Sequence, residues 1–273
     1  MDRLYDIYDT LIYKYADQRI ISYPLMGSPF PIIIIMSAYW YMIKNGEKWM
    51  ANRPAYNIKF FIQTYNILQV LVCGFLGIRA LHIILQRDLV CITHFTDSEY
   101  DLKVIFYTWL YYLIKISDLL DTVFFVLRKK FALVSTLHTY HHTLMVVGSY
   151  ALARYLPGGE MAVMGTLNSL VHSVMYSYYF YCLYNNSRQN IWWKKYITQM
   201  QLGQFCFLLI FYTWKLFFVK NCAYPKLYLV FAIIQILAML NMFGNYYYNA
   251  FIKTKPAQPA KGEVNNNKTK KVN

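Results

Sequence analysis

The chain has 273 residues, of which 58% are hydrophobic and only 15% charged, and its formal net charge is +14. Soluble domains carry a charge on about a quarter of their residues, so the composition excludes an ordinary soluble domain. A strongly basic chain could bind nucleic acid, but the lysines and arginines fall mostly between apolar runs and in the C-terminal tail. That placement is typical of membrane topology and argues against a nucleic-acid partner.

Apolar runs of about 20 residues, long enough to cross a bilayer, recur along the chain. They predict an all-α, polytopic membrane protein with seven transmembrane helices, at 29–43, 60–85, 105–127, 133–152, 160–184, 196–219 and 227–251. Residues 1–28 are mixed polar and show no cleavable signal peptide, so we expect a separate N-terminal segment there. Residues 29–252 would form the membrane domain, and the Lys-, Asn- and Pro-rich residues 253–273 a disordered tail.

The distribution of basic residues predicts the orientation. An odd number of spans puts the termini on opposite sides, and most of the 27 Lys and Arg residues lie in the tail or on its side of the membrane. The positive-inside rule therefore places the C-terminus in the cytosol and the N-terminal segment in the lumen. Lys270 and Lys271 resemble the dilysine retrieval signal of endoplasmic reticulum membrane proteins, which predicts a multi-pass protein of that membrane.

This topology carries consequences for the loops. The 5 cysteines show no CxxC or metal-ligand spacing, but Cys91 and Cys222 both fall in loops expected in the oxidising lumen. A disulfide between them is a reasonable expectation. The glycosylation sequons at Asn185 and Asn267 lie on the cytosolic side and should stay unmodified.

Three of the 6 histidines are clustered in the stretch LHTYHHTLM, at 137–145. The stretch is apolar on both sides and is predicted to be helical, so His138, His141 and His142 share one helix face. A lone histidine in a span often only bonds to backbone. Three on one face at membrane depth favour a functional site.

Three other spans carry polar residues at helical spacing. These residues are Lys115, Asp118, Asp121 and Thr122, then Asn168, His172 and Tyr176, and finally Thr198, Gln201 and Gln204. At a rise of about 1.5 Å per residue, one layer of the cytosolic half of the bilayer would hold Asp118, Asp121, His141, His172, Gln201 and Gln204. Such groups are costly against lipid, so we expect them to meet in a buried chamber reached from the cytosol.

Two interpretations without chemistry compete with this chamber. A hydrogen-bond network between helices is common, but it does not account for four histidines, two carboxylates and a lysine together. A seven-span receptor or transporter would spread its polar layer over the full membrane depth.

Histidine boxes in membrane helices first indicate metal, because HxxHH is one of the boxes of the di-iron desaturases and hydroxylases. Such a centre needs about eight histidine or carboxylate ligands. The chain has 6 histidines, and His82 and His94 are expected near the far side. A metal-dependent desaturase or hydroxylase with a mononuclear site is the alternative. The favoured interpretation uses no metal and takes imidazole as nucleophile or general base.

Four ordered blocks carry a resemblance to a known family. They are KxxDxxDTxFFVLRKK at 115–130, HxxHH at 138–142, NxxxHxxMYxYY at 168–179 and TxxQxxQF at 198–205. The blocks resemble the signatures of the ELO family, the elongases of very long chain fatty acids, and the likeness spans Pro29 to about Ile252. One departure is Asp118, where many members carry Glu, which keeps the carboxylate but shortens its reach by a methylene.

The resemblance implies a very-long-chain 3-oxoacyl-CoA synthase of the endoplasmic reticulum. Such an enzyme condenses a long-chain acyl-CoA with malonyl-CoA to 3-ketoacyl-CoA, carbon dioxide and CoA, and needs no cofactor beyond these substrates. It also implies six spans forming a barrel around a tunnel open to the cytosol, with the first span outside. The expected partners are a separate 3-ketoacyl-CoA reductase, a dehydratase and an enoyl-CoA reductase, and self-association is compatible with it.

The family analogy assigns roles to the polar residues. His141 would take the acyl group as an acyl-imidazole in a ping-pong scheme, and His172 would orient malonyl-CoA or assist its decarboxylation. Asp118 and Asp121 would fix the imidazole tautomers, and Lys115 would balance their charge. The remaining candidate catalytic residues are His138, from the box, and the oxyanion donors His142, Asn168, Gln201 and Gln204.

Coenzyme A carries phosphates, which need basic residues at the cytosolic mouth. Arg128, Lys129 and Lys130 lie there, inside one of the family blocks. They are expected to form a phosphate-binding rim with Lys194, Lys195, Lys253 and Lys255. For each lysine taken singly, an ordinary positive-inside cluster is the alternative.

Overall fold

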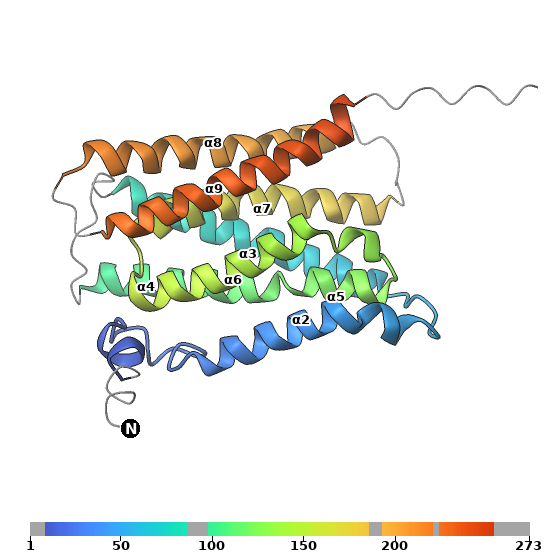
Figure 1. Ribbon diagram of the computed structural model, residues 1–273, viewed down its shortest axis with the longest axis horizontal. Helices are drawn as coiled ribbons and strands as arrows, with labels where there is room; N and C mark the ends of the chain where they lie inside the picture. The colour runs from blue at the N-terminus through green and yellow to red at the C-terminus, as the bar shows by residue number, and fades with distance from the viewer. Residues whose placement is uncertain (1–8, 87–97, 186–192, 221–223, 254–273) are drawn as a thin grey trace, which may run out of the picture.

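The computed structural model describes residues 9–86, 98–185, 193–220 and 224–253, and over these ranges it is helical with no strand. The long helices lie side by side in one bundle (Figure 1). They are α2 (Phe30–Met50), α3 (Lys59–Leu85), α4 (Glu99–Ser117), α5 (Leu120–Leu127), α6 (Thr136–Tyr155), α7 (Glu160–Tyr184), α8 (Lys194–Phe218) and α9 (Lys226–Tyr247). Three short helical segments are η1 (Thr10–Lys14), η2 (Phe131–Leu133) and η3 (Tyr248–Ile252). The predicted all-α class is confirmed.

Two of the predicted spans differ from the structure by more than four residues or by a break. The run expected at 29–43 continues as α2 to Met50, because the polar residues after it lie on exposed turns of the same helix. The run at 105–127 is two helices, since the backbone after Ser117 changes to the tighter i to i+3 hydrogen bonds. Leu119 N, for example, donates to Ile116 O at 3.1 Å. This break falls beside Asp118.

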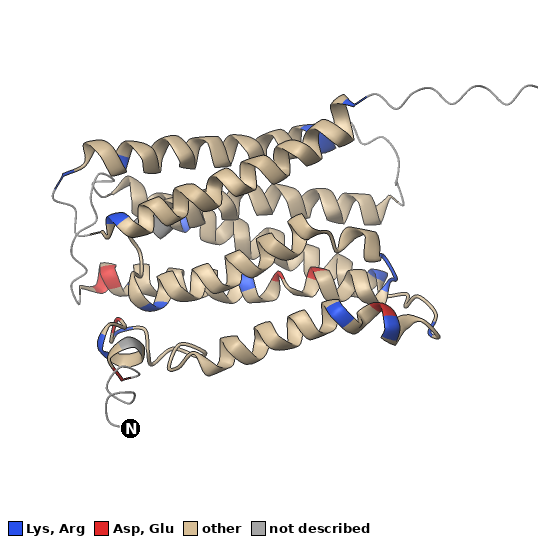
Figure 2. Cartoon of the chain, viewed as in Figure 1, with Lys and Arg blue, Asp and Glu red and all other residues tan. Residues whose placement is uncertain are grey.

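Within the described ranges, three helices are long and apolar enough to cross a membrane: Lys59–Leu85, Lys194–Phe218 and Lys226–Ile252. Their outer faces expose large apolar side chains such as Phe61, Ile210 and Phe231. Figure 2 shows the charged residues gathered near both ends of the bundle, with few along its middle. A lipid environment accommodates this pattern, because apolar surface there needs no water and charge belongs at the two interfaces.

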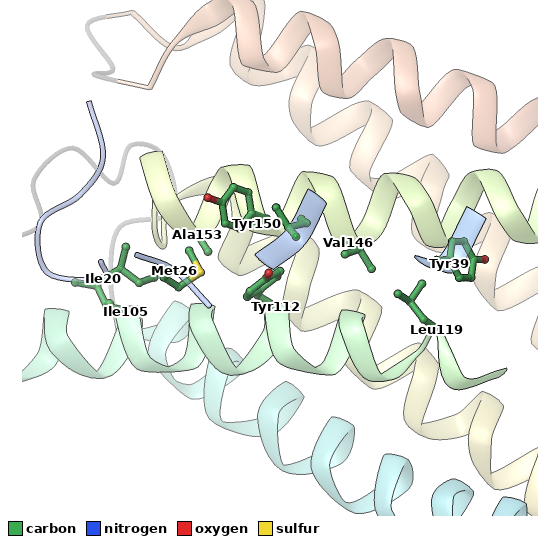
Figure 3. Packing of buried hydrophobic residues seen from close by; sticks show 10 residues of the cluster. Ile20, Met26, Tyr39, Ile105, Tyr112, Leu119, Val146, Tyr150 and Ala153 are labelled. Carbon is green, nitrogen blue, oxygen red and sulfur yellow. The ribbon is translucent and has the colours of Figure 1, made fainter. Parts of the chain in front are cut away.

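The N-terminal segment packs against one end of the bundle. Ile20 and Met26 are fully buried in a cluster with Tyr112 and Ala153, between α4 and α6 (Figure 3). The buried guanidinium of Arg154 in α6 donates to the Met26 and Ile12 carbonyls. The segment is therefore held by a buried charge as well as by apolar contact.

Helices α3 and α7 approach each other closely through glycine. A Cβ built at Gly77 would lie 2.7 Å from Leu170 Cδ2 and 3.3 Å from the backbone nitrogen of Leu170. A Cβ at Gly74 would lie 3.3 Å from Ser173 Oγ. Small residues of this kind let membrane helices pack backbone to backbone. The close contact brings the polar residues of α3 within reach of α7.

Replacing Gly77 by alanine should destabilise the fold by about 1–3 kcal/mol, because the added methyl overpacks the α3–α7 contact. The measurement is the unfolding midpoint of the detergent-solubilised protein. Gly203→Ala is the matched control, since a Cβ there meets nothing within 4 Å. It should be neutral or stabilise by up to about 1 kcal/mol through helix propensity. Equal midpoints for the two variants would contradict the prediction.

Several predictions from the sequence concern residues outside the described ranges. They are the Cys91–Cys222 disulfide, the Asn267 sequon, the position of His94, the Lys255 part of the rim and the dilysine signal in the tail. Of the other cysteines, Cys73 is buried in α3. Asn185, which carries the other sequon, follows the last residue of α7 and is exposed.

Candidate active site

Asp118 is the centre of a buried polar network. Its carboxylate accepts hydrogen bonds from Lys115 Nζ at 2.8 Å, Gln69 Nε2 at 2.8 Å and Tyr176 OH at 3.1 Å. Lys115 and Asp118 are 1% and 2% exposed, so this ion pair is dry. Burying an ion pair costs several kcal/mol per ion unless further hydrogen bonds satisfy both partners. Here α3 and α7 supply those bonds.

Lys115 also links α4 to Asn168 of α7. Its ammonium donates to Asn168 Oδ1 at 2.9 Å, and Tyr111 OH donates to the same oxygen at 3.0 Å. The Asn168 carbonyl oxygen is thus occupied from one side. This fixes the amide orientation, and the NH₂ group is what Asn168 can offer to a bound molecule.

Tyr176 joins the two carboxylates that the sequence places one helical turn apart. Its hydroxyl lies 2.8 Å from Asp121 Oδ2, 3.1 Å from Asp118 Oδ1 and 3.2 Å from Tyr65 OH. The helix break between Asp118 and Asp121 does not separate them, since both still face α7. A single hydroxyl therefore contacts both carboxylates.

The four histidines of α6 and α7 lie together. The ring centroids of His141 and His172 are 6.3 Å apart, those of His141 and His142 are 5.5 Å apart, and those of His138 and His142 are 4.2 Å apart. His172 Nδ1 is buried, has no hydrogen-bond partner among the residues that the structure describes, and lies 3.6 Å from Asp118 Oδ2. The histidine box and the Asp118 network thus meet at His172.

His138 connects the box to α5 and α2. Its Nε2 lies 2.8 Å from Thr122 Oγ1, and that hydroxyl lies 3.2 Å from Tyr39 OH of α2. Thr122 is fully buried. Since both ends of this chain of contacts lie within helices, the His138 ring is oriented by the packing of three elements.

Two cavities meet beside these rings. The first, of about 420 Å³, has a partly polar wall that includes Asp121, His138, His141, His142, His172, Lys194 and Gln201. The second, of about 250 Å³, has an almost wholly apolar wall formed by α6, α7, α8 and α9, and it reaches Tyr212 and Tyr228. Both cavities are lined by His141, Asn168, Gln204 and Phe205. His141 thus stands between a polar and an apolar compartment.

The sequence matches the model of the family described as ELO, GNS1/SUR4 family, over residues 24–259. The chain belongs to the ELO family. It is 33% identical over 266 residues to very long chain fatty acid elongase 7 of Drosophila melanogaster, covering 96% of this chain and 80% of that one. It is 33% identical over 259 residues to very long chain fatty acid elongase 2 of Mus musculus, covering 93% and 86%.

The family resemblance seen in the four sequence blocks is thereby confirmed, and with it the fatty acid elongase activity, a very-long-chain 3-oxoacyl-CoA synthase. The desaturase or hydroxylase alternative is not favoured. With its apolar helices, this elongase is a multi-pass membrane protein.

The structure brings most of the predicted site residues of the elongase together. The four histidines, Asp121, Asn168, Gln201 and Gln204 line the polar cavity, while Lys115 and Asp118 lie behind its wall. Gln201 Nε2 is directed toward Met175 Sδ at 3.6 Å. Within the described ranges, no group of three His, Cys, Asp or Glu is placed to hold a metal ion.

The residues of the predicted phosphate-binding rim do not all lie at the polar cavity. Lys194 lines the polar cavity, whereas the other described rim residues do not: Arg128, Lys129, Lys130, Lys195 and Lys253. Lys129 Nζ instead donates to the Ala51 carbonyl at 3.2 Å. Lys194 is therefore the rim residue that the geometry places at the site.

Sequence reasoning missed the contribution of α3. Gln69 is 4% exposed, and its Nε2 donates to Asp118, to Ser117 Oγ at 3.0 Å and to Tyr65 OH at 2.9 Å. Asn66 and Gln69 are an i, i+3 pair inside an apolar run, which is the same signal that identified the other spans. Applied to the second predicted span, this signal would have predicted that its polar residues also face the buried chamber.

Proposed function

We propose that this elongase condenses a long-chain acyl-CoA with malonyl-CoA in the polar cavity, by way of an acyl-imidazole on His141. The products are 3-ketoacyl-CoA, carbon dioxide and CoA, in the first step of very long chain fatty acid elongation. The observation that carries this proposal is the position of His141 at the junction of the two cavities. An acyl chain needs an apolar compartment, and the CoA thioester needs a polar one.

The residues around His141 suit the chemistry of each half-reaction. A ring nitrogen attacks the thioester carbonyl, and the NH₂ group of Asn168 donates to the oxygen that becomes negative. Gln201 and Gln204 are further donors on the same cavity wall. His172, whose Nδ1 lies 3.6 Å from Asp118 Oδ2, assists decarboxylation of malonyl-CoA. Lys194 contacts the phosphates of CoA.

The membrane arrangement follows from the same proposal. Seven spans, six of them around the cavities, place the polar chamber toward the cytosol, where acyl-CoA and malonyl-CoA are dissolved. The N-terminal segment then lies in the lumen and the tail in the cytosol of the endoplasmic reticulum. The 3-ketoacyl product needs a reductase, a dehydratase and an enoyl reductase, which act as separate partners.

The direct experiment is incubation of the purified protein with acyl-CoAs of different length and labelled malonyl-CoA. The expected result is labelled 3-ketoacyl-CoA formed with release of carbon dioxide. Iron analysis of the same sample tests the desaturase or hydroxylase alternative. Stoichiometric iron together with no labelled condensation product would overturn the proposed function.

Gly148 offers a test of the apolar cavity as the acyl compartment. It lies two helical turns beyond His141 on the same face of α6, lines the cavity, and a Cβ there would meet nothing within 4 Å. The side chain of Gly148→Leu should therefore begin in open space and project into the cavity. We expect activity toward the longest acyl-CoAs accepted to fall by about tenfold or more, with shorter ones retained.

The measurement is the product profile across chain lengths. Gly203→Leu is a control for the added side chain, since Gly203 also faces open space but does not line this cavity. An unchanged chain-length profile for Gly148→Leu would place the acyl chain elsewhere.

A further inference from the structure

The proposed condensation has a proton requirement. In the first half-reaction, His141 attacks the acyl carbon, the C–S bond breaks, and the proton lost by the imidazole goes to the CoA thiolate. In the second, carbon dioxide leaves malonyl-CoA and the electron pair left on carbon forms the new C–C bond. The C–N bond to His141 then breaks and leaves an imidazolide. Condensation therefore consumes one proton, which neither substrate carries.

A line of polar groups leads from the polar cavity to the histidines. Asp121 lines the cavity, and its Oδ2 lies 2.8 Å from Tyr176 OH. Tyr176 OH lies 3.1 Å from Asp118 Oδ1, and Asp118 Oδ2 lies 3.6 Å from His172 Nδ1. The His172 ring lies beside that of His141. The two long steps are those into and out of His172, at 3.6 Å from Asp118 Oδ2 and 6.3 Å between the ring centroids of His172 and His141. Catalytic hydrogen bonds are often long before substrate binds.

The charges along this line favour the binding of one proton by the two carboxyl groups. The titratable groups in contact with the two carboxylates include Lys115 from α4, and Tyr176 and His172 from α7. Tyr65 of α3 bonds to Tyr176, and the neutral amide of Gln69 bonds to Asp118. Lys115 supplies one positive charge for two carboxyl groups. Like charges sharing a buried site are costly, so a proton bound by the pair removes the excess negative charge. Tyr176, fully buried between them, has one hydrogen to pass in either direction.

We propose that Asp121, Tyr176 and Asp118 form a proton relay that serves the condensing half-reaction. Asp121 gives its proton to the Tyr176 oxygen as Tyr176 gives its own to Asp118 Oδ1. The Asp118 carboxyl, now protonated, turns about its Cβ–Cγ bond and gives this proton to His172 Nδ1, as His172 passes its own proton from Nε2 to the His141 imidazolide. Asp121 is reprotonated from the aqueous phase through the cavity. The relay rests on the acyl-imidazole mechanism proposed above.

The test separates the two half-reactions. CoA release is followed after mixing enzyme with acyl-CoA alone, and 3-ketoacyl-CoA formation is followed after labelled malonyl-CoA is added. Tyr176→Phe should leave CoA release unchanged, because that step needs no external proton. It should slow condensation by about a hundredfold or more, the usual size of a lost proton-transfer contribution. Asp121→Asn keeps the side-chain shape and should give the same selective loss.

Tyr112→Phe is the matched control. Tyr112 is a fully buried tyrosine of α4 whose ring packs against Tyr150 in the cluster around Met26, so both half-reactions should keep their rates. Full condensation activity in Tyr176→Phe or Asp121→Asn overturns the relay. So does equal slowing of both half-reactions, since that is the result of a merely structural role. If the unmutated protein releases no CoA from acyl-CoA alone, the acyl-imidazole itself is overturned. This outcome differs from a failure of the relay, because it is seen without any substitution.

Discussion

His141→Ala should lower the rate of 3-ketoacyl-CoA formation by about a thousandfold or more, because it removes the nucleophile on which both half-reactions depend. The geometry makes His141 the natural acceptor, since it lines both the polar and the apolar cavity. His172 lines only the polar one. His172→Ala should therefore cost less, about a hundredfold, and CoA release from acyl-CoA alone should survive it. The measurement is labelled product per unit time at saturating substrate.

His82→Ala is the control for the loss of an imidazole. His82 is exposed on α3, and its contact is with Gln86 at 3.1 Å, on the same helix. It should retain full activity. Unfolding midpoints measured alongside establish that His141→Ala is folded. A folded His141→Ala variant that still condenses at a tenth of the normal rate or faster would exclude the acyl-imidazole.

Local spacing predicted what lies within one helix. Lys115 and Asp118, three residues apart, form an ion pair at 2.8 Å, and the rings of the histidine box lie together on α6. Such contacts depend only on helix periodicity, so they can be read from the chain. The break at Asp118 could not, because Leu119 and Leu120 follow it and the run stays apolar. Its cause is tertiary, in the bonds that Asp118 receives from α3 and α7.

The spacing of residues along the chain could not predict contacts between different helices. That Gln69 bonds to Asp118 depends on which face α3 turns toward α7, and the close approach at Gly77 sets that face. The residues of the predicted phosphate-binding rim do not form one group in the structure, for a related reason. Lys129 follows α5 whereas Lys194 begins α8, and the direction of a long side chain depends on its local backbone. Lys129 has a positive φ of 53° and is directed toward the Ala51 carbonyl.

Breaking the buried ion pair should have the largest effect on stability. Lys115→Met leaves the Asp118 carboxylate without its counter-charge, and Asp118→Asn leaves the Lys115 ammonium without its own. Each single variant should lose about 3–5 kcal/mol of unfolding free energy, because a lone buried charge is strongly destabilising. The measurement is denaturant or thermal unfolding in detergent, compared with the Gly203→Ala protein.

The double variant Lys115→Met/Asp118→Asn should recover most of that loss. It removes both charges of the pair, and the new amide is the same size as the carboxyl and keeps an oxygen for Gln69 and Tyr176. Asn168 keeps its bond from Tyr111. A coupling of several kcal/mol between the two positions is thus expected. Condensation should stay impaired in the double variant, because a neutral amide cannot relay a proton to His172. Additive losses of stability in the double variant would show that the two charges do not depend on each other. Recovered condensation would show that the Asp118 carboxylate serves packing alone.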